Sequence, residues 1–409
     1  MARPIKKDME YLVKRRGKPD WDSHNERSHV PPYEGKDGRW NMGASGLPQG
    51  RWTARGVYRI ESEVAYGSSH GSHLFRNPQN HALLLKPWGA HPTSVFIDLE
   101  TTGLSGGTGT YAFLAGLGIC GSESFKVIQL FLSDPGCESE WLSALEAELP
   151  RDLGFVTYNG ACFDMPLLRT RYTLARRTPV WKAAPHMDLL LLARHFYRKR
   201  LTSCSLSSIE SHILGVRRSG DDIQGRDIPA VYADFLRTRD AACLRGVFYH
   251  NRLDIVSLAA LTMKVAALLD GEGCSGEDWL RCGDLWYIMG RGKEAQAAWQ
   301  KAMEQEDGVC GANLRFADSS RRSGDFESAK RHFEVALRYE KHPFEILENL
   351  AKLEEHRFQN YEAALDYAKR ALSWLDSRRS LRDCKWSLQR REVIHRIERL
   401  ERKIMNRGA

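Results

Sequence analysis

The sequence predicts an α/β domain with a mixed central sheet flanked by helices, followed by an all-α solenoid. Short β-branched and aromatic runs closed by glycine turns dominate the stretch after residue 93, which is typical of buried strands. From Trp279 onward the sequence is helical and repeats itself at a fixed offset. A chain of 409 residues is also too long for one ordinary core, so two domains with tails are expected.

Composition restricts the compartment and the class of partner. No apolar run approaches the length of a membrane-spanning helix, so no membrane contact is expected. The nine cysteines form no C-x-x-C pair, which argues against a zinc ribbon or a redox pair and fits reduced thiols in the cytoplasm. The net charge of +8 favours a polyanionic partner such as nucleic acid.

The first ninety residues are predicted to lie outside the main α/β domain. Residues 1–50 are basic and rich in Gly, Pro and Asn, which is typical of a largely disordered tail. Apolar residues return in 51–92, and we expect an N-terminal extension that packs on the next domain through a hairpin or flanking strands. His70 and His73 stand among Gly and Ser and are predicted to lie in a polar loop.

The first chemical signal follows the apolar run 95–97. Side chains alternate along a strand, so Asp98 and Glu100 point the same way while Leu99 points back. Neighbouring carboxylates repel each other unless a cation or a proton neutralises them, and such oxygen donors suit Mg²⁺ or Mn²⁺. A D-x-E pair alone is equally consistent with a solvated strand end.

The elements that follow place a second carboxylate near the first. Segments 111–119 and 125–132 are predicted to continue an antiparallel meander, 138–149 an amphipathic helix, and 155–158 a fourth strand. That strand runs into a turn and a helix, with Asp164 near the helix start. By itself such an Asp is commonly a helix cap.

The third carboxylate lies on a long helix. Helices are expected at 188–197 and 205–214, and a polar loop at 215–229 offers Arg217, Arg218 and Arg226 to phosphates. The next helix is predicted from about 240 to 269. His250 and Asp254 are four residues apart and share one of its faces.

Small residues recur with a period near 34 in the C-terminal part, which is the tetratricopeptide signature. Gly290 recurs as Gly324 in the same register. We expect tetratricopeptide-like repeats over 279–376 and a basic capping helix over 377–409. The repeated alanines are Ala295 and Ala302, Ala329 and Ala336, and Ala364 and Ala371.

Together the three signals resemble the DEDD superfamily of 3′–5′ exonucleases, which have a ribonuclease-H-like fold. More narrowly, the chain resembles the YprB-like family, predicted exonucleases with a C-terminal tetratricopeptide region. The matching stretches are FIDLETTGLSGGTGTYAFLAGLG, VTYNGACFDMPLLRTR and YHNRLDIVSLAAL, so the nuclease domain is expected over 93–270.

The resemblance implies that Asp98, Glu100, Asp164 and Asp254 hold two divalent ions, Mg²⁺ or Mn²⁺. One ion would ready a water for attack on the phosphodiester, and the other would stabilise the leaving oxygen. The members of the superfamily carry Tyr four residues, or His five residues, before the last Asp. This chain reverses both, with His250 at minus four and Tyr249 at minus five.

Helix geometry favours His250 as general base or water-orienting group, with Tyr249 as the fallback. Thr101, Asn159 and Phe163 are expected to contact the terminal nucleotide. The predicted function is a two-metal 3′–5′ exonuclease acting on single-stranded DNA or RNA, with a protein partner on the repeats. The alternative is a non-catalytic scaffold that binds nucleic acid and protein, and a ribonuclease-H-type endonuclease ranks third.

Overall fold

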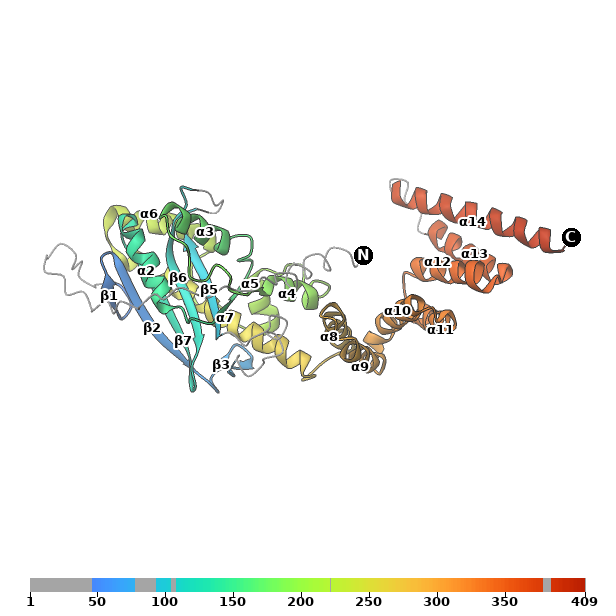
Figure 1. The fold of residues 1–409 in the computed structure, drawn as a ribbon, viewed down its shortest axis with the longest axis horizontal. Coiled ribbons are helices and arrows are strands. Elements are labelled where there is room, and N and C mark those ends of the chain that lie inside the picture. The colour runs from blue at the N-terminus through green and yellow to red at the C-terminus, as the bar shows by residue number, and fades with distance from the viewer. Residues whose placement is uncertain (1–45, 78–92, 104–107, 221, 378–383, 409) are drawn as a thin grey trace. The chain divides into compact units, whose positions relative to one another are not determined.

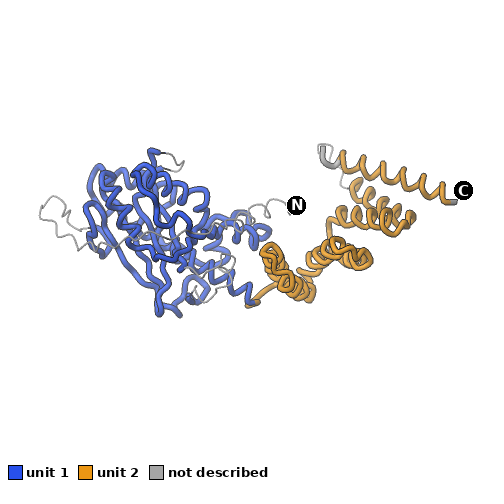
Figure 2. Tube along the Cα trace, in the orientation of Figure 1, with its two compact units in different colours: residues 1–270 blue, residues 271–409 orange. Residues whose placement is uncertain are grey.

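The computed structural model describes residues 46–77, 93–103, 108–220, 222–377 and 384–408. The predicted disordered tail falls almost wholly outside these ranges, as does part of the predicted extension over 51–92. The chain divides into two compact units, residues 1–270 and 271–409 (Figure 2). No helix among the described residues combines the length and the apolar character that crossing a membrane requires.

A seven-stranded mixed sheet forms the centre of the first unit, in the order β1-β2-β7-β6-β5-β8-β9 (Figure 1). The strands β1, β2, β7, β6 and β5 pair antiparallel, and β5, β8 and β9 pair parallel. The predicted meander is therefore confirmed, and the hairpin β1–β2 extends it at one edge. The strands are β1 (Gly50–Ala54), β2 (Val57–Ala65), β5 (Thr93–Thr101), β6 (Ala112–Cys120), β7 (Ser124–Leu132), β8 (Leu153–Thr157) and β9 (His186–Asp188).

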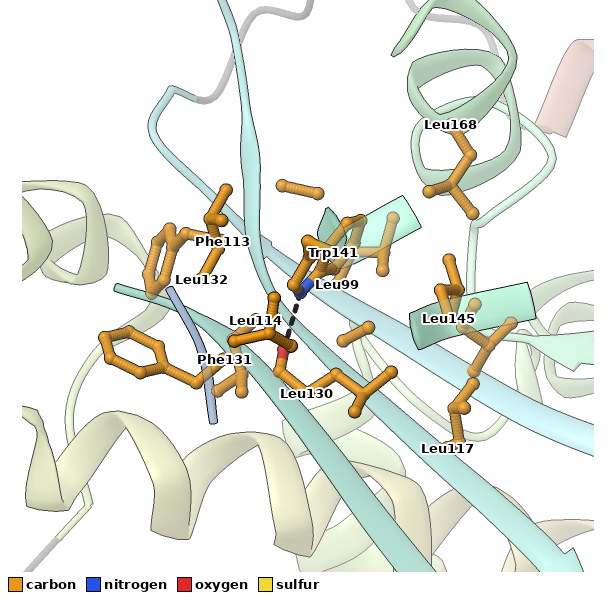
Figure 3. Packing of buried hydrophobic residues seen from close by; sticks show 14 of the residues in the cluster. Leu99, Phe113, Leu114, Leu117, Leu130, Phe131, Leu132, Trp141, Leu145 and Leu168 are labelled. Carbon is orange, nitrogen blue, oxygen red and sulfur yellow. Dashed lines mark hydrogen bonds between the residues drawn. The ribbon is translucent and has the colours of Figure 1, made fainter. Parts of the chain in front are cut away.

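Helices cover both faces of this sheet, which confirms the predicted fold class. On one face Trp141 of α2 donates its indole N–H to the carbonyl of Leu130 at 2.9 Å and packs beside Leu99 (Figure 3). On the other face α7 crosses β5, β6 and β7. The principal helices are α2 (Glu138–Glu148), α3 (Asp164–Leu174), α4 (Leu189–Tyr197), α5 (Leu206–Ile209), α6 (Ile228–Thr238) and α7 (Arg245–Leu269).

Two expectations about local structure are wrong. Residues His70 and His73 form a small hairpin, β3 (Ser69–His70) with β4 (His73–Leu74), and not a polar loop. His70 Nε2 lies 3.0 Å from Ser257 Oγ on α7, a long-range contact that the Gly- and Ser-rich local sequence does not reveal. The long helix also begins at Arg245, since Asp240 instead caps a short 3₁₀ turn, Ala241–Leu244.

The second unit is all helical among its described residues. Each of the repeated alanines is fully or almost fully buried, so these small residues lie where helices pack closely. A π-helical turn, Glu354–Phe358, follows α12 and lies in sequence between the second and third pairs of repeated alanines. The helices are α8 (Gly276–Ile288), α9 (Gly292–Met303), α10 (Glu306–Ser323), α11 (Phe326–Tyr339), α12 (Phe344–Leu353), α13 (Tyr361–Ser377) and α14 (Cys384–Gly408).

Candidate active site

The D-x-E pair of β5 faces helix α7. Gly116 of β6 lies directly opposite Asp98, and a Cβ there would come within 2.4 Å of Asn251 Oδ1. Because Gly116 has no side chain, the Asn251 amide reaches the sheet and donates to Asp98 Oδ2 at 3.0 Å. Gln129 of β7 donates to Asn251 Oδ1 at 3.0 Å and fixes the orientation of that amide. Asp98 is therefore held by a buried polar chain that spans three strands and α7.

Asp164 is the first residue of α3, as the sequence predicts. The turn before it is held by Asp188, whose carboxylate accepts the backbone N–H groups of Asn159 at 2.7 Å and Ala161 at 3.1 Å. Asp188 also caps α4 through the N–H of Leu190. One buried carboxylate thus fixes the approach of the turn that carries Asp164.

Helix α7 supplies the last carboxylate and the candidate base. His250 Nε2 lies 3.7 Å from Asp254 Oδ2, one helical turn away. Its Nδ1 lies 2.9 Å from Asp222 Oδ1, so a carboxylate holds the far side of the ring. The Tyr249 hydroxyl instead accepts the backbone N–H of Ser219 at 3.4 Å. Of the two candidates, His250 is the side chain beside Asp254.

Arg218 is not available to phosphates, so that expectation is wrong. Its guanidinium donates to Asp254 Oδ1 at 2.6 Å and to Glu210 Oε2 at 2.7 Å. A third nitrogen lies 2.9 Å from His250 Nδ1. Glu210 is buried and also accepts the Ser257 hydroxyl at 2.6 Å. Arg218 is therefore an internal cation that compensates two carboxylates brought together only by the fold.

The four predicted carboxylates influence one another electrostatically. Burial raises the pKa of Asp98 well above its usual range, and the charges of Asp254 and Asp164 raise it further. The pKa of Glu100 is raised in the same way, by burial and by the charges of Asp98, Asp254 and Asp164. Burial and Asp188 raise the pKa of Asp164 to about 7. Burial also raises the pKa of Asp254, opposed by His250 and Arg218.

This donor set fits a divalent cation by its chemistry. Carboxylates that raise one another's pKa on burial carry negative charge that a hard, oxygen-preferring cation would neutralise. Within the described ranges, however, no group of three or more His, Cys, Asp or Glu side chains forms a ready metal-binding site. Arg218 holds one oxygen of Asp254, so metal binding would require these side chains to adjust.

We expect the metal-free protein to lose stability as pH rises from about 6.5 to 8.5. Folding raises the pKa values of the acidic cluster, so the folded protein binds protons that the unfolded chain releases near pH 4. These protons stabilise the folded state. Their contribution is lost as the pH rises through the folded-state pKa values. Asp164 alone would account for about 1 kcal/mol over this window. His70, with a pKa lowered to about 4 by burial, is neutral in the folded state, and its partial protonation in the unfolded chain near pH 6.5 opposes this loss by only about 0.4 kcal/mol.

Urea denaturation in EDTA at the two pH values measures this effect. Asp164→Asn should flatten the pH dependence, whereas Asp152→Asn, an exposed control, should leave it unchanged. Added Mn²⁺ should stabilise the protein most at the higher pH, because the carboxylates are then ionised. A stability that rises with pH in EDTA would contradict the electrostatic account.

The predicted substrate contacts lie at the edge of this cluster. Thr101 ends β5 and donates its hydroxyl to the Gly103 carbonyl at 2.8 Å. Asn159 takes a left-handed backbone conformation in the turn after β8. Phe163 immediately precedes Asp164 and is 54% exposed, which is unusual for a phenylalanine. An exposed aromatic ring next to a candidate metal-binding carboxylate is suited to stacking on a base.

Sequence reasoning missed several residues that shape the site. Asn251 and Asp188 act through contacts with residues far away in sequence, so periodicity carries no sign of them. Asn251 left little signal, since it stands between His250 and Arg252 in a polar stretch of the helix. Gly116 left a clearer one, because a glycine within a strand marks a close approach of another group.

Residues 95–266 match the sequence profile of the RNase_H superfamily. With the mixed sheet and its helices, this match shows that the first unit contains an RNase_H superfamily domain, a nuclease fold that implies a nucleic-acid substrate. The chain is also 28% identical over 340 residues to the uncharacterized protein YprB of Bacillus subtilis (strain 168), covering 77% of this chain and 81% of that protein.

Proposed function

We propose that the protein is a metal-dependent 3′–5′ exonuclease that hydrolyses single-stranded nucleic-acid ends. The observation that supports this most is the mutual influence of Asp98, Glu100, Asp164 and Asp254, which come from three separate elements of a nuclease fold. A solvated strand end would not gather four partly or fully buried carboxylates. Their negative charge is also opposite to what a phosphate-binding protein needs unless cations are bound.

The four carboxylates would hold two Mg²⁺ or Mn²⁺ ions, which supply Lewis-acid stabilisation of the phosphodiester and of the leaving oxygen. Asp98 lies on β5, an interior strand of the sheet, and is the natural shared ligand. Glu100 and Asp254 belong on the side of the attacking water, and Asp164 on the side of the leaving group.

His250 accepts the proton of the attacking water at Nε2 in this proposal. Nδ1 contacts both Asp222 Oδ1 and a nitrogen of Arg218, so this role requires the tautomer in which Nδ1 donates to Asp222 and Nε2 is free to accept. Arg218 keeps Asp254 oriented by holding Oδ1, which leaves Oδ2 toward His250. Phe163 stacks on the terminal base, and Asn159 and Thr101 position its sugar and phosphate.

End-labelled single-stranded DNA and RNA, incubated with Mn²⁺, Mg²⁺ or EDTA, test this function. Metal-dependent shortening from the 3′ end supports the exonuclease and identifies the sugar that it accepts. Internal cuts would instead indicate an endonuclease. A 5′-label and a 3′-label on the same strand distinguish these outcomes in one experiment.

A non-catalytic scaffold is the second candidate, and one observation favours it. Arg218 already neutralises part of Asp254, and the described residues form no ready metal-binding site. Such a protein would bind single strands and protein partners without cleaving. Binding of Mn²⁺ and of nucleic acid without any cleavage would select this alternative.

A further inference from the structure

A basic cavity of about 360 Å³ lies in the helical unit, away from the acidic cluster in sequence. It is formed where the end of α10 and the start of α11 face α12 and the π-helical turn. None of the described residues that line it is acidic. The lining residues are Arg321, Arg322, Phe326, Asn349, Lys352, Leu353, His356 and Arg357.

The two most important cations are held by aromatic rings. The Arg357 guanidinium lies 4.4 Å from the centre of the Phe326 ring. Arg322 donates to the Tyr287 hydroxyl at 2.5 Å and lies 5.8 Å from the centre of that ring. Neutral partners orient a guanidinium without cancelling its charge, so both arginines are positioned for an external anion.

The other cations of the cavity are only weakly engaged. Lys352 pairs with Glu348 at 3.0 Å, and Arg321 with Asp318 at 3.0 Å, each within its own helix and open to solvent. Exposed pairs of this kind contribute little and exchange readily for a stronger anion.

The π-helical turn that carries His356 and Arg357 is firmly anchored. Glu355 is fully buried in this turn and accepts hydrogen bonds from Arg396, Arg399 and Lys403 of α14. Burial alone would raise the pKa of Glu355, yet the bonds from Arg399 and Lys403 lower it to about 2. The carboxylate therefore stays charged, and the wall of the cavity stays in place. Single π-turns inside helices are frequent at functional sites.

We propose that this cavity binds the phosphate backbone of a single-stranded nucleic acid. This inference rests on the proposed function, because the bound strand would be the substrate of the proposed nuclease. Arginine forks match phosphate oxygens in pairs, and an aromatic-backed guanidinium also offers a flat surface to a base. An acidic peptide would satisfy the charge but would make no use of the stacked Arg357–Phe326 surface.

Fluorescence anisotropy of the full chain in EDTA, where no cleavage occurs, tests the cavity directly. The probes are single-stranded DNA and RNA of about 12 nucleotides. The double variant Arg322→Gln/Arg357→Gln is compared with Arg331→Gln/Arg338→Gln, which removes the same charge from α11 outside the cavity. We expect the first variant to bind about tenfold more weakly and to lower the slope of log K against log salt by about 1.4.

Equal losses in the two variants, or no loss in the first, would overturn the proposal. Tighter binding of a polyglutamate peptide than of either oligonucleotide would overturn it in favour of a protein ligand. The outcomes also separate this cavity from the nuclease. If the wild type cleaves but the cavity variant binds the strand as tightly as the wild type, only the cavity proposal is rejected. If the cavity variant binds more weakly but the wild type never cleaves, only the exonuclease proposal is rejected.

Discussion

Replacing Asp98 with asparagine is expected to lower metal-dependent cleavage by about three orders of magnitude, because the proposed mechanism makes Asp98 the shared ligand of both ions. The same change should make the metal-free protein more stable. At a pH above its raised pKa, Asp98 carries a charge that burial and the charges of Asp254 and Asp164 disfavour, so a neutral side chain there relieves unfavourable interactions. The asparagine can still accept the amide of Asn251 through its own oxygen.

Single-turnover cleavage with Mn²⁺ and thermal unfolding in EDTA measure the two effects on the same preparation. Asp152→Asn provides the control, since this exposed aspartate just before β8 carries the same charge outside the cluster. A variant that is both inactive and less stable than the wild type would point to misfolding. Retained cleavage would remove Asp98 from the mechanism.

Replacing His250 with glutamine is expected to lower kcat by about two to four orders of magnitude, with little change in KM. The imidazole lies next to Asp254 and is held from behind by Asp222. Glutamine can keep a hydrogen bond to Asp222 but is a poor proton acceptor. Binding of Mn²⁺ should persist, because none of the four carboxylates is altered.

Tyr249→Phe is the matched comparison for this prediction. It removes only the hydroxyl that accepts the Ser219 N–H, so kcat should stay within about threefold of the wild type. Single-turnover rates at saturating Mn²⁺ distinguish the two side chains. If Tyr249→Phe is the slow variant and His250→Gln is not, the tyrosine takes the role of proton acceptor or water-orienting group.

Several features of the site could be predicted from short-range rules. Strand alternation places Asp98 and Glu100 on one face and sends Leu99 to the opposite face beside Trp141. The turn after β8 leaves Asp164 at the start of α3, and helical spacing puts His250 beside Asp254. These relations depend only on the geometry of one strand, one turn or one helix, which a local pattern encodes.

The tertiary structure alone decided how these pieces are neutralised and held. Arg218 lies in a segment whose local composition indicates a solvated loop, yet the fold pairs it with Glu210 and Asp254. Asn251 reaches Asp98 only because Gly116, far away in sequence, leaves the space. Burial makes an unpaired charge costly, so each such charge takes whatever partner the packing brings near. The sequence by itself therefore determined how each acid is placed on its own strand, turn or helix, and the packing of α7 against the sheet decided the partners of Asp98 and Asp254.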